Sequence, residues 1–417
     1  MTQAETGSRV TIDGDRLARM LAEVNQFGAL PSGGVQRLAW TDPEVDARAW
    51  LLEQCTQAGL DAEQDEVGNI WAWAGTRPAI VLGSHLDTVP NGGGFDGALG
   101  VLAALEVLVS AREAGIPEAN RLALVCFTDE EGVRFDTGMT GSRAVAGTLS
   151  KEELAKVRTP DGHRFADALR ERGLDPSRVH GAGNRRKDIV SYLELHIEQG
   201  RRLEQMNKPV AGVSAIAGLS SWHIRVHGQS NHAGTTQLED RRDALLPIAR
   251  ATLTARQMMT EFPGLVATVG DAHVLGGASN IIPGVTQCTL DVRSCDEKHI
   301  ETATRDILDS LLESARDNRC RTELEEVKRL PTVALDAAVS SAIQSAYPGQ
   351  QEPPVLTSMA GHDAMSLAPA GVPCGMIFVR SRNGMSHCPE EHSSAQDCAG
   401  GAQWLADAAV GLARELR

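Results

Sequence analysis

The chain has 417 residues, of which 42% are hydrophobic and 23% are charged, so it is an ordinary globular sequence with room for two domains. Its formal net charge is −15 and it has no basic cluster, which argues against nucleic acid or an anionic membrane as a partner. The eight cysteines are scattered without a CxxC pair, and the N-terminus does not look like a secretory signal. We therefore expect a cytoplasmic protein with reduced thiols.

The first 211 residues alternate between helical and strand-like segments. Helices are expected over residues 43–59 and 97–115, and buried strands over residues 78–87 and 121–131. Strands that alternate with helices are typical of an α/β layer with a mainly parallel sheet.

Residues 212–330 show a different pattern. Trp222, Ile224 and Val226 alternate with polar residues, as in a strand with one buried face. The expected segments are a strand at 220–229, a helix at 241–262, strands at 264–275 and 286–294, a helix at 296–318 and a strand at 321–330. Pro247 should kink or restart the first helix. This strand and helix order predicts a ferredoxin-like α+β domain.

The last segment, 331–417, returns to helices and one apolar strand, "GVPCGMIFV". The predicted fold class is therefore α/β, with a discontinuous catalytic domain over 1–211 and 331–417. The α+β domain at 212–330 would be inserted into it.

Histidines and acids gather where the predicted strands of the α/β layer end. The candidates are His85, Asp87, Asp96, Glu130, Glu131, His196 and His387. Open α/β sheets bind ligands outside the carboxyl ends of their strands. Each residue taken singly is typical of a turn, and "TDEEG" alone could begin a helix. Together, they indicate a metal site with nitrogen and oxygen ligands.

A divalent cation would also explain the acids that follow the strand at 121–131. Asp129, Glu130 and Glu131 would otherwise repel one another and lose hydration. One glutamate could bind the metal while its neighbour, left free, accepts a proton from a bound water. The His85-x-Asp87 spacing fits a carboxylate that orients a ligand imidazole.

Six segments in order resemble the amidase branch of the aminoacylase/carboxypeptidase-type dimetal hydrolases. They are "GSHLDTVPNGGGFDGALGV", "TDEEGVRF", "LELHIEQG", "GQSNHAGTT", "GHDAM" and "GMSHCPEE". The branch includes N-carbamoyl-L-amino-acid hydrolases, allantoate amidohydrolases and β-ureidopropionases. The resemblance extends from about residue 20 to the C-terminus, and "HIEQG" favours this branch over the peptidases.

The resemblance implies two divalent metal ions, commonly zinc, manganese, cobalt or nickel in this branch. His85 and His196 would bind one ion, and Glu131 and His387 the other. Asp96 would bridge the two ions.

The resemblance also implies catalytic roles. Glu130 would be the general base that carries a proton from water to the leaving nitrogen, and Asp87 would orient His85. The inserted domain would serve as lid and dimerisation domain. Its His232 would reach the site of the neighbouring subunit and steady the oxyanion, so a homodimer is expected. Without the motif, His232 would be interpreted as a loop histidine.

Three residues are expected to bind the substrate. Asn280 and Arg293 match the pair that holds the substrate carboxylate in the branch, and the planar fork of an arginine suits that task. Gln199 would contact the substrate amide. Arg293 could otherwise be a surface residue at a strand end. His362 could bind in the site, cap a helix or support a ligand.

The expected reaction is hydrolysis of a linear C–N amide. The first candidate substrate is an N-carbamoyl-L-amino acid, which would give the amino acid, ammonia and carbon dioxide. The alternatives are allantoate, then β-ureidopropionate or an N-acyl amino acid, with dipeptides ranked lower. A binding protein that retains the fold without catalysis is disfavoured because all five matched ligand positions are occupied.

Overall fold

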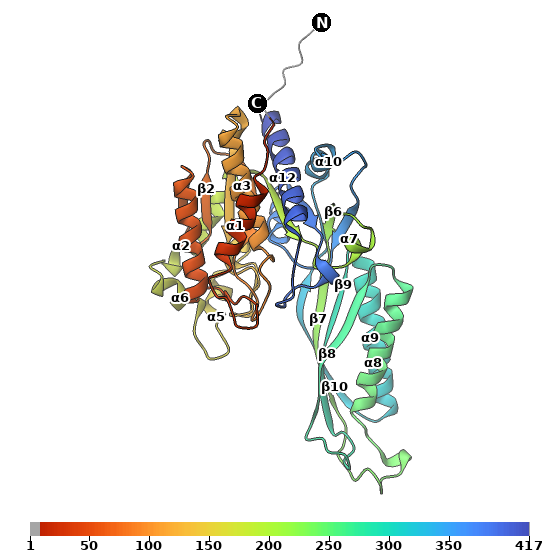
Figure 1. The fold of residues 1–417 in the computed structure, drawn as a ribbon. Coiled ribbons are helices and arrows are strands. Elements are labelled where there is room, and N and C mark those ends of the chain that lie inside the picture. The colour runs from red at the N-terminus through yellow and green to blue at the C-terminus, as the bar shows by residue number, and fades with distance from the viewer. Residues whose placement is uncertain (1–8, 417) are drawn as a thin grey trace. The chain divides into compact units, whose positions relative to one another are not determined.

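The computed structural model describes residues 9–416, which form two compact units (Figure 1). Unit 1 extends to Ser214 and resumes over Ala334–Leu356 and from Gly361 onward. Unit 2 comprises Ala215–Val333 together with Thr357–Ala360. Within the described residues, no helix is both long enough and apolar enough to cross a membrane.

The larger sheet has the strand order β1-β2-β4-β3-β5-β13-β6-β11, and β12 pairs with β6. Its strands are β1 (Asp61–Gln64), β2 (Ile70–Trp73), β3 (Ala79–His85), β4 (Leu122–Phe127), β5 (Ile189–Ile197), β6 (Val210–Ile216), β11 (Val333–Ala334), β12 (Val355–Ser358) and β13 (Cys374–Val379). The central strands β4, β3, β5 and β13 are parallel, and the pairs β1–β2, β2–β4 and β6–β13 are antiparallel. The predicted α/β class with a mainly parallel sheet is confirmed.

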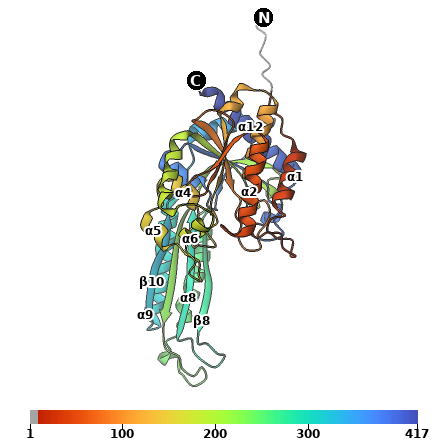
Figure 2. The same ribbon diagram turned by 90° about the vertical axis from the view of Figure 1, so that its left-hand side faces the viewer.

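Helices cover the larger sheet (Figure 2). The helices of unit 1 are α1 (Gly14–Val24), α2 (Asp42–Gln57), α3 (Ala98–Glu113), α4 (Thr140–Ala146), α5 (Lys151–Lys156), α6 (Phe165–Glu171), α7 (Arg202–Gln205), α10 (Ala337–Ser345), α11 (Ala364–Leu367) and α12 (Ala395–Glu415). Helices α3 and α12 pack on β3 and β5, and their apolar side chains fill the core of unit 1. This burial removes apolar surface from water, the main stabilising term of a folded domain.

The smaller sheet, in unit 2, is antiparallel with the order β10-β7-β9-β8. Its elements are β7 (Gly218–His227), α8 (Leu245–Glu261), β8 (Val266–Leu275), β9 (Val285–Ser294), α9 (Glu297–Asp317) and β10 (Arg321–Leu330). The predicted strand and helix order is confirmed. Helix α8 begins at Leu245, so Pro247 lies in its first turn, where no intrahelical N–H bond is needed. The helix begins at Leu245 and not at residue 241 as expected, so Pro247 neither kinks nor restarts it.

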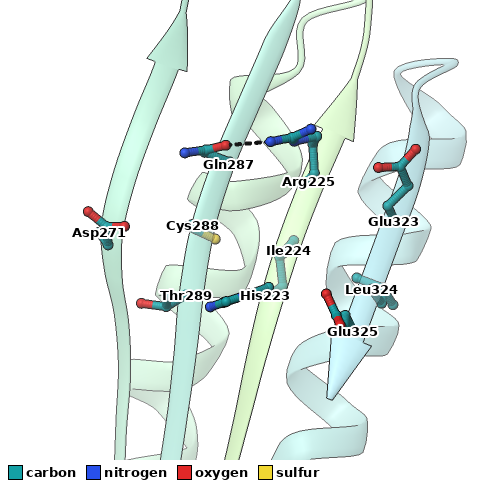
Figure 3. Close-up of a pocket in the computed structure, with 10 residues that line it drawn as sticks. All are labelled: His223, Ile224, Arg225, Asp271, Gln287, Cys288, Thr289, Glu323, Leu324 and Glu325. Carbon is teal, nitrogen blue, oxygen red and sulfur yellow. Dashed lines mark hydrogen bonds between the residues drawn. The ribbon is translucent and has the colours of Figure 1, made fainter. Parts of the chain in front are cut away.

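The two faces of the smaller sheet differ. One face packs on α8 and α9 through a core that includes Ile224, Val226 and Leu290. The opposite face bears polar side chains, and Figure 3 shows a hollow there that none of the predicted site residues lines. The Arg225 side chain donates to Gln287 on this face.

Candidate metal centre

The parallel strands of unit 1 bring the predicted ligands to one edge of the sheet. His85 is the last residue of β3 and pairs in register with Phe127, the last residue of β4. His196 lies near the end of β5, in register with Phe378 of β13. The acids after β4 therefore begin next to His85, and the loop after β13 begins next to His196, as the strand-end pattern predicts.

One potential ligand group contains His85, Asp96 and His196, all of them buried. Asp96 Oδ1 lies 3.1 Å from His196 Nε2 and 3.7 Å from His85 Nε2. The Nδ1 atoms of the two rings lie 3.0 Å from backbone oxygens, those of Asp87 and Ile197. Those contacts assign a proton to each Nδ1, so each Nε2 is left as the metal-binding nitrogen.

A second potential ligand group contains Asp96, Glu131 and His387. His387 Nε2 lies 3.4 Å from Asp96 Oδ2 and 3.6 Å from Glu131 Oε2. The two oxygens of the Asp96 carboxylate therefore face different groups. The structure brings together all five residues for which the resemblance implied metal binding, and Asp96 is the one that the two groups share.

A glycine makes the position of Asp96 possible. Gly97 has φ +62°, and a Cβ atom there would lie 2.4 Å from the ring of His85. Only glycine tolerates both the left-handed backbone and this close approach. Helix α3 begins at the next residue, Ala98, so the loop that carries Asp96 ends directly before this helix.

The acids after β4 carry the electrostatic signature of a cation site. Burial, with added repulsion from neighbouring carboxylates, raises the pKa of Asp129, Glu130 and Glu131 well above the usual range. Glu131 Oε1 is buried without a hydrogen-bond partner among the described residues. Carboxylate oxygens of this kind and three histidine nitrogens form a donor set that divalent zinc, manganese, cobalt or nickel can use. The residues present therefore fit the expected ions.

Glu130 lies beside these ligands but is in neither group of the described residues. Its Oε2 is 3.6 Å from His85 Nε2, and 11% of its side chain is exposed. Asp87 holds the glutamate pair, because its carboxylate accepts hydrogen bonds from the backbone N–H of Glu130 (3.2 Å) and of Glu131 (3.1 Å).

Asp87 contacts His85 chiefly through its backbone. The carbonyl oxygen is 3.0 Å from His85 Nδ1, whereas the nearer carboxylate oxygen is 3.6 Å away. The His-x-Asp spacing thus predicts the contact, but a different oxygen of Asp87 makes it.

Gln199 lies against the shared ligand. Its Nε2 donates to Asp96 Oδ2 at 2.7 Å and to Ser386 Oγ at 3.3 Å. Its Oε1 has no hydrogen-bond partner among the described residues. The amide nitrogen is therefore engaged by Asp96 and Ser386, and the amide oxygen remains available.

In unit 2, His232 and Asn280 lie on paired loop segments. The backbone N–H of Ala233 donates to the Asn280 carbonyl at 2.9 Å. His232 is exposed, and its Nδ1 accepts hydrogen bonds from the backbone N–H of Gly234 and Thr235. Nδ1 is therefore unprotonated, and the proton of the neutral ring sits on Nε2, where it can be donated outward.

Arg293 lies at the end of β9 and is held on two sides. Its Nε and one terminal nitrogen donate to the two oxygens of Asp291, at 2.8 and 3.2 Å. The other terminal nitrogen donates to the Met359 carbonyl at 3.2 Å. The guanidinium is thus fixed in one orientation at a half-exposed position.

Other residues also lie near the centre. The sequence left a role in the site, a helix cap or support of a ligand open for His362, and it predicted no role for Glu194, Ser386 or Glu391. Glu194 and His362 form a third potential ligand group with His196, and the His362 ring lies edge-on to His196 at 4.5 Å. Alternation along β5, which puts Glu194 and His196 on one face, was the available signal. Ser386 and Glu391 also bond to the Asp96 loop. The only sequence feature that pointed to Ser386 and Glu391 was their nearness to His387 in "GMSHCPEE".

The chain is similar to known proteins over most of its length. Residues 81–410 match the model of peptidase family M20/M25/M40. The chain is 39% identical over 399 residues to an N-carbamoyl-L-amino acid amidohydrolase of Geobacillus stearothermophilus, covering 94% of this chain and 97% of that one. It is 33% identical to the allantoate amidohydrolase of Bacillus subtilis, with coverage of 93% and 95%.

A solved structure is similar over almost the whole chain. An amidase of the hydantoinase/carbamoylase family from Burkholderia multivorans superimposes with a TM-score of 0.88 at 33% identity, covering 96% of this chain and 98% of that one. The chain belongs to peptidase family M20/M25/M40. Within it, the chain is a metal-dependent amidohydrolase that acts on linear amides.

Proposed function

We propose that this protein hydrolyses the carbamoyl group of N-carbamoyl-L-amino acids to the free amino acid, ammonia and carbon dioxide. The observation that carries the proposal is the Asp96 carboxylate, shared by two ligand groups with Glu130 beside them. The similarity to the Geobacillus stearothermophilus enzyme supports this choice of substrate.

The residues that would hold the two ions are His85, His196, Glu131 and His387, together with Asp96, which both ligand groups share. Ions bound there would supply Lewis-acid polarisation of the scissile carbonyl and would acidify a water. Glu130 takes a proton from the attacking water and gives it to the leaving nitrogen. Burial suits Glu130 to this role because a raised pKa brings a carboxylate closer to neutral pH.

The inserted domain is proposed to complete the site in a cytoplasmic homodimer. His232 of one subunit donates a hydrogen bond from its Nε2–H to the oxyanion that forms in the other subunit, and keeps its proton. Arg293, with Asn280, binds the substrate carboxylate, and Gln199 Oε1 accepts a hydrogen bond from the substrate amide. The tautomer of His232 and the fixed guanidinium of Arg293 support these roles.

The test is ammonia release from three substrates offered side by side. The purified protein, loaded with manganese or zinc, is given N-carbamoyl-L-methionine, N-carbamoyl-β-alanine and allantoate. We expect ammonia from the methionine derivative at the highest kcat/KM, and its loss on treatment with a chelator. No ammonia from any of the three by metal-loaded protein would overturn the proposal and direct the search to N-acyl amino acids and dipeptides.

Allantoate is the second candidate substrate. The similarity to the Bacillus subtilis allantoate amidohydrolase favours it, because the reaction also cleaves a linear C–N bond next to a carboxylate. A kcat/KM for allantoate above that for N-carbamoyl-L-methionine would assign the protein to this activity instead.

A further inference from the structure

We propose that Glu391 is a positioning residue for the metal centre, because it fixes both the backbone turn and the hydroxyl group that orient the Asp96 carboxylate. This inference rests on the proposed metal-dependent function. Glu391 follows His387 by four residues and is 5% exposed.

The first contact of Glu391 is with the turn that carries Asp96. Its Oε1 accepts hydrogen bonds from the backbone N–H of Phe95 (2.8 Å) and of Asp96 (3.0 Å). The three residues before Phe95 are glycines, whose backbone is the most free to adopt other conformations. A buried carboxylate that accepts two N–H groups is a strong restraint on such a turn.

The glycine run also makes room for this carboxylate. A Cβ atom on Gly93 would lie 2.2 Å from the Cδ and Oε1 atoms of Glu391. The carboxylate therefore occupies space over the turn that any other residue at position 93 would take. The turn and the Glu391 side chain are therefore complementary in both shape and hydrogen bonding.

The second contact runs through Ser386 to the carboxylate of Asp96. Ser386 Oγ lies 2.8 Å from Glu391 Oε2 and 2.9 Å from Asp96 Oδ2. Its single proton can be donated to one of these oxygens at a time. Gln199 Nε2 donates to the same Oδ2 atom. Together these bonds set the rotation of the Asp96 carboxylate, so that Oδ1 faces the histidine pair.

These contacts join the two halves of the centre. Ser386, His387 and Glu391 lie in one short loop, and Asp96 lies in another 295 residues away in sequence. Among the described residues, Glu391 is in none of the potential ligand groups, and both of its oxygens are occupied by the contacts above. Its role is therefore to hold a ligand in place.

The test compares metal binding by full-length variants. Wild type, Glu391→Ala, Glu391→Gln and Ser386→Ala are titrated with Co²⁺, and stoichiometry, affinity and the visible absorption spectrum are recorded. Losing a residue that supports a metal ligand typically weakens metal binding by about 10–100-fold, and we expect this for Glu391→Ala together with a changed spectrum. Glu391→Gln retains an acceptor for both N–H groups and should remain within about threefold of wild type.

Glu106→Ala is the matched control. Glu106 is also buried, and it accepts a backbone N–H from Asp13, the hydroxyl hydrogen of Ser110 and an ion-paired hydrogen bond from Arg16. It lies in the middle of α3 and bonds to no ligand of the centre. We expect this variant to lower the unfolding temperature without changing Co²⁺ affinity or the spectrum. Equal losses of Co²⁺ affinity in Glu106→Ala and Glu391→Ala would overturn the positioning role.

Two further outcomes are decisive. A Glu391→Ala protein that binds two Co²⁺ ions with wild-type affinity and spectrum would refute the inference. In the double variant with Ser386→Ala, a loss of affinity smaller than the product of the two single losses would support a connected chain. Because these readouts do not involve turnover, a wild type that binds two ions but releases no ammonia would overturn only the substrate proposal.

Discussion

Glu130 and Glu131 are neighbours in sequence but meet different surroundings. Glu131 shares a potential ligand group with Asp96 and His387, whereas Glu130 lies beside His85 with its carboxylate outside that group. The backbone N–H groups of both residues are held by the same Asp87 carboxylate. In the proposed mechanism, two identical side chains would therefore take different tasks, with Glu131 binding metal and Glu130 transferring the proton.

Replacing the proposed base should separate these two tasks. We expect Glu130→Gln to lower kcat by on the order of 10²–10⁴-fold, because the amide cannot accept the proton from water. The metal content, measured on the dialysed protein, should stay at the wild-type value. Glu131→Gln is the comparison, and it should lose metal from the second ligand group. Near-normal turnover by Glu130→Gln would remove Glu130 from the base role.

The guanidinium of Arg293 can also be tested by a conservative change. A lysine offers a point charge in place of a fork, so it cannot bind Asp291 bidentately and present a fixed face to a carboxylate. We expect Arg293→Lys to lower kcat/KM for carboxylate substrates by about 10–100-fold, the worth of a hydrogen bond to a charged group. Uncharged amides should react as with wild type.

Arg225→Lys is the control for that measurement. Arg225 lies on β7 of the same sheet, and its side chain donates to Gln287. The Arg225→Lys variant should leave kcat/KM unchanged for both carboxylate substrates and uncharged amides. If Arg293→Lys reduced the rates of charged and uncharged substrates equally, Arg293 would be a structural residue.

Among the elements, α12 shows how tightly the helix layer packs on the strands that carry the ligands. Gly400 and Gly401 are adjacent in this helix, but only Gly401 faces the sheet. A Cβ atom on Gly401 would lie 2.6 Å from Val379 Cγ2 in β13 and 3.1 Å from Leu195 Cδ1 in β5, whereas one on Gly400 would meet nothing within 4 Å. Leu195 directly precedes His196, so this contact lies next to the metal centre.

The two glycines should respond to alanine in opposite ways. We expect Gly400→Ala to raise the free energy of unfolding by roughly 0.5–1 kcal/mol, because alanine is the better helix former and nothing obstructs it. Gly401→Ala should lower it by roughly 1–3 kcal/mol through overpacking. Urea unfolding followed by circular dichroism measures both values. A stabilising Gly401→Ala would mean that α12 can move away from the sheet without loss.

At the scale of the whole molecule, the proposed active site needs two copies of the chain. Glu130 belongs to unit 1, and His232, whose proton points outward from an exposed loop, belongs to unit 2. If His232 acts on the partner, each active site combines residues of two subunits. This arrangement predicts complementation between inactive variants.

Mixed dimers of Glu130→Gln and His232→Asn should regain activity that neither variant has alone. In such a dimer, one site combines an intact Glu130 with an intact His232 from the partner, and the other site lacks both. The measurement is ammonia release after the two variants are co-expressed. Co-expression of Glu130→Gln with the double variant should give none, because no subunit then carries Glu130. Failure of the first mixture to recover activity would contradict a role for His232 across subunits.

The sequence alone determined the class of the fold, the order of elements in unit 2 and the histidines and acids expected at the sheet edge, but not Glu194, Ser386 and Glu391 beside them. These features depend on local periodicity and on strand ends, and both can be read from neighbouring residues. The carboxyl ends of parallel strands lie at one edge of the sheet whatever the details of the loops, so His85, His196 and the acids after β4 had to meet.

Only the tertiary structure decided how the loops hold these residues. It assigned the two oxygens of Asp96 to different ligand groups, replaced the Asp87 carboxylate by its carbonyl as the main contact of His85, and placed Glu391 on the Asp96 turn. Hydrogen bonds between loops join residues that are far apart in the chain, and their geometry depends on how the whole domain packs. No local pattern encodes such a pairing, because either partner alone is an ordinary polar residue in a turn.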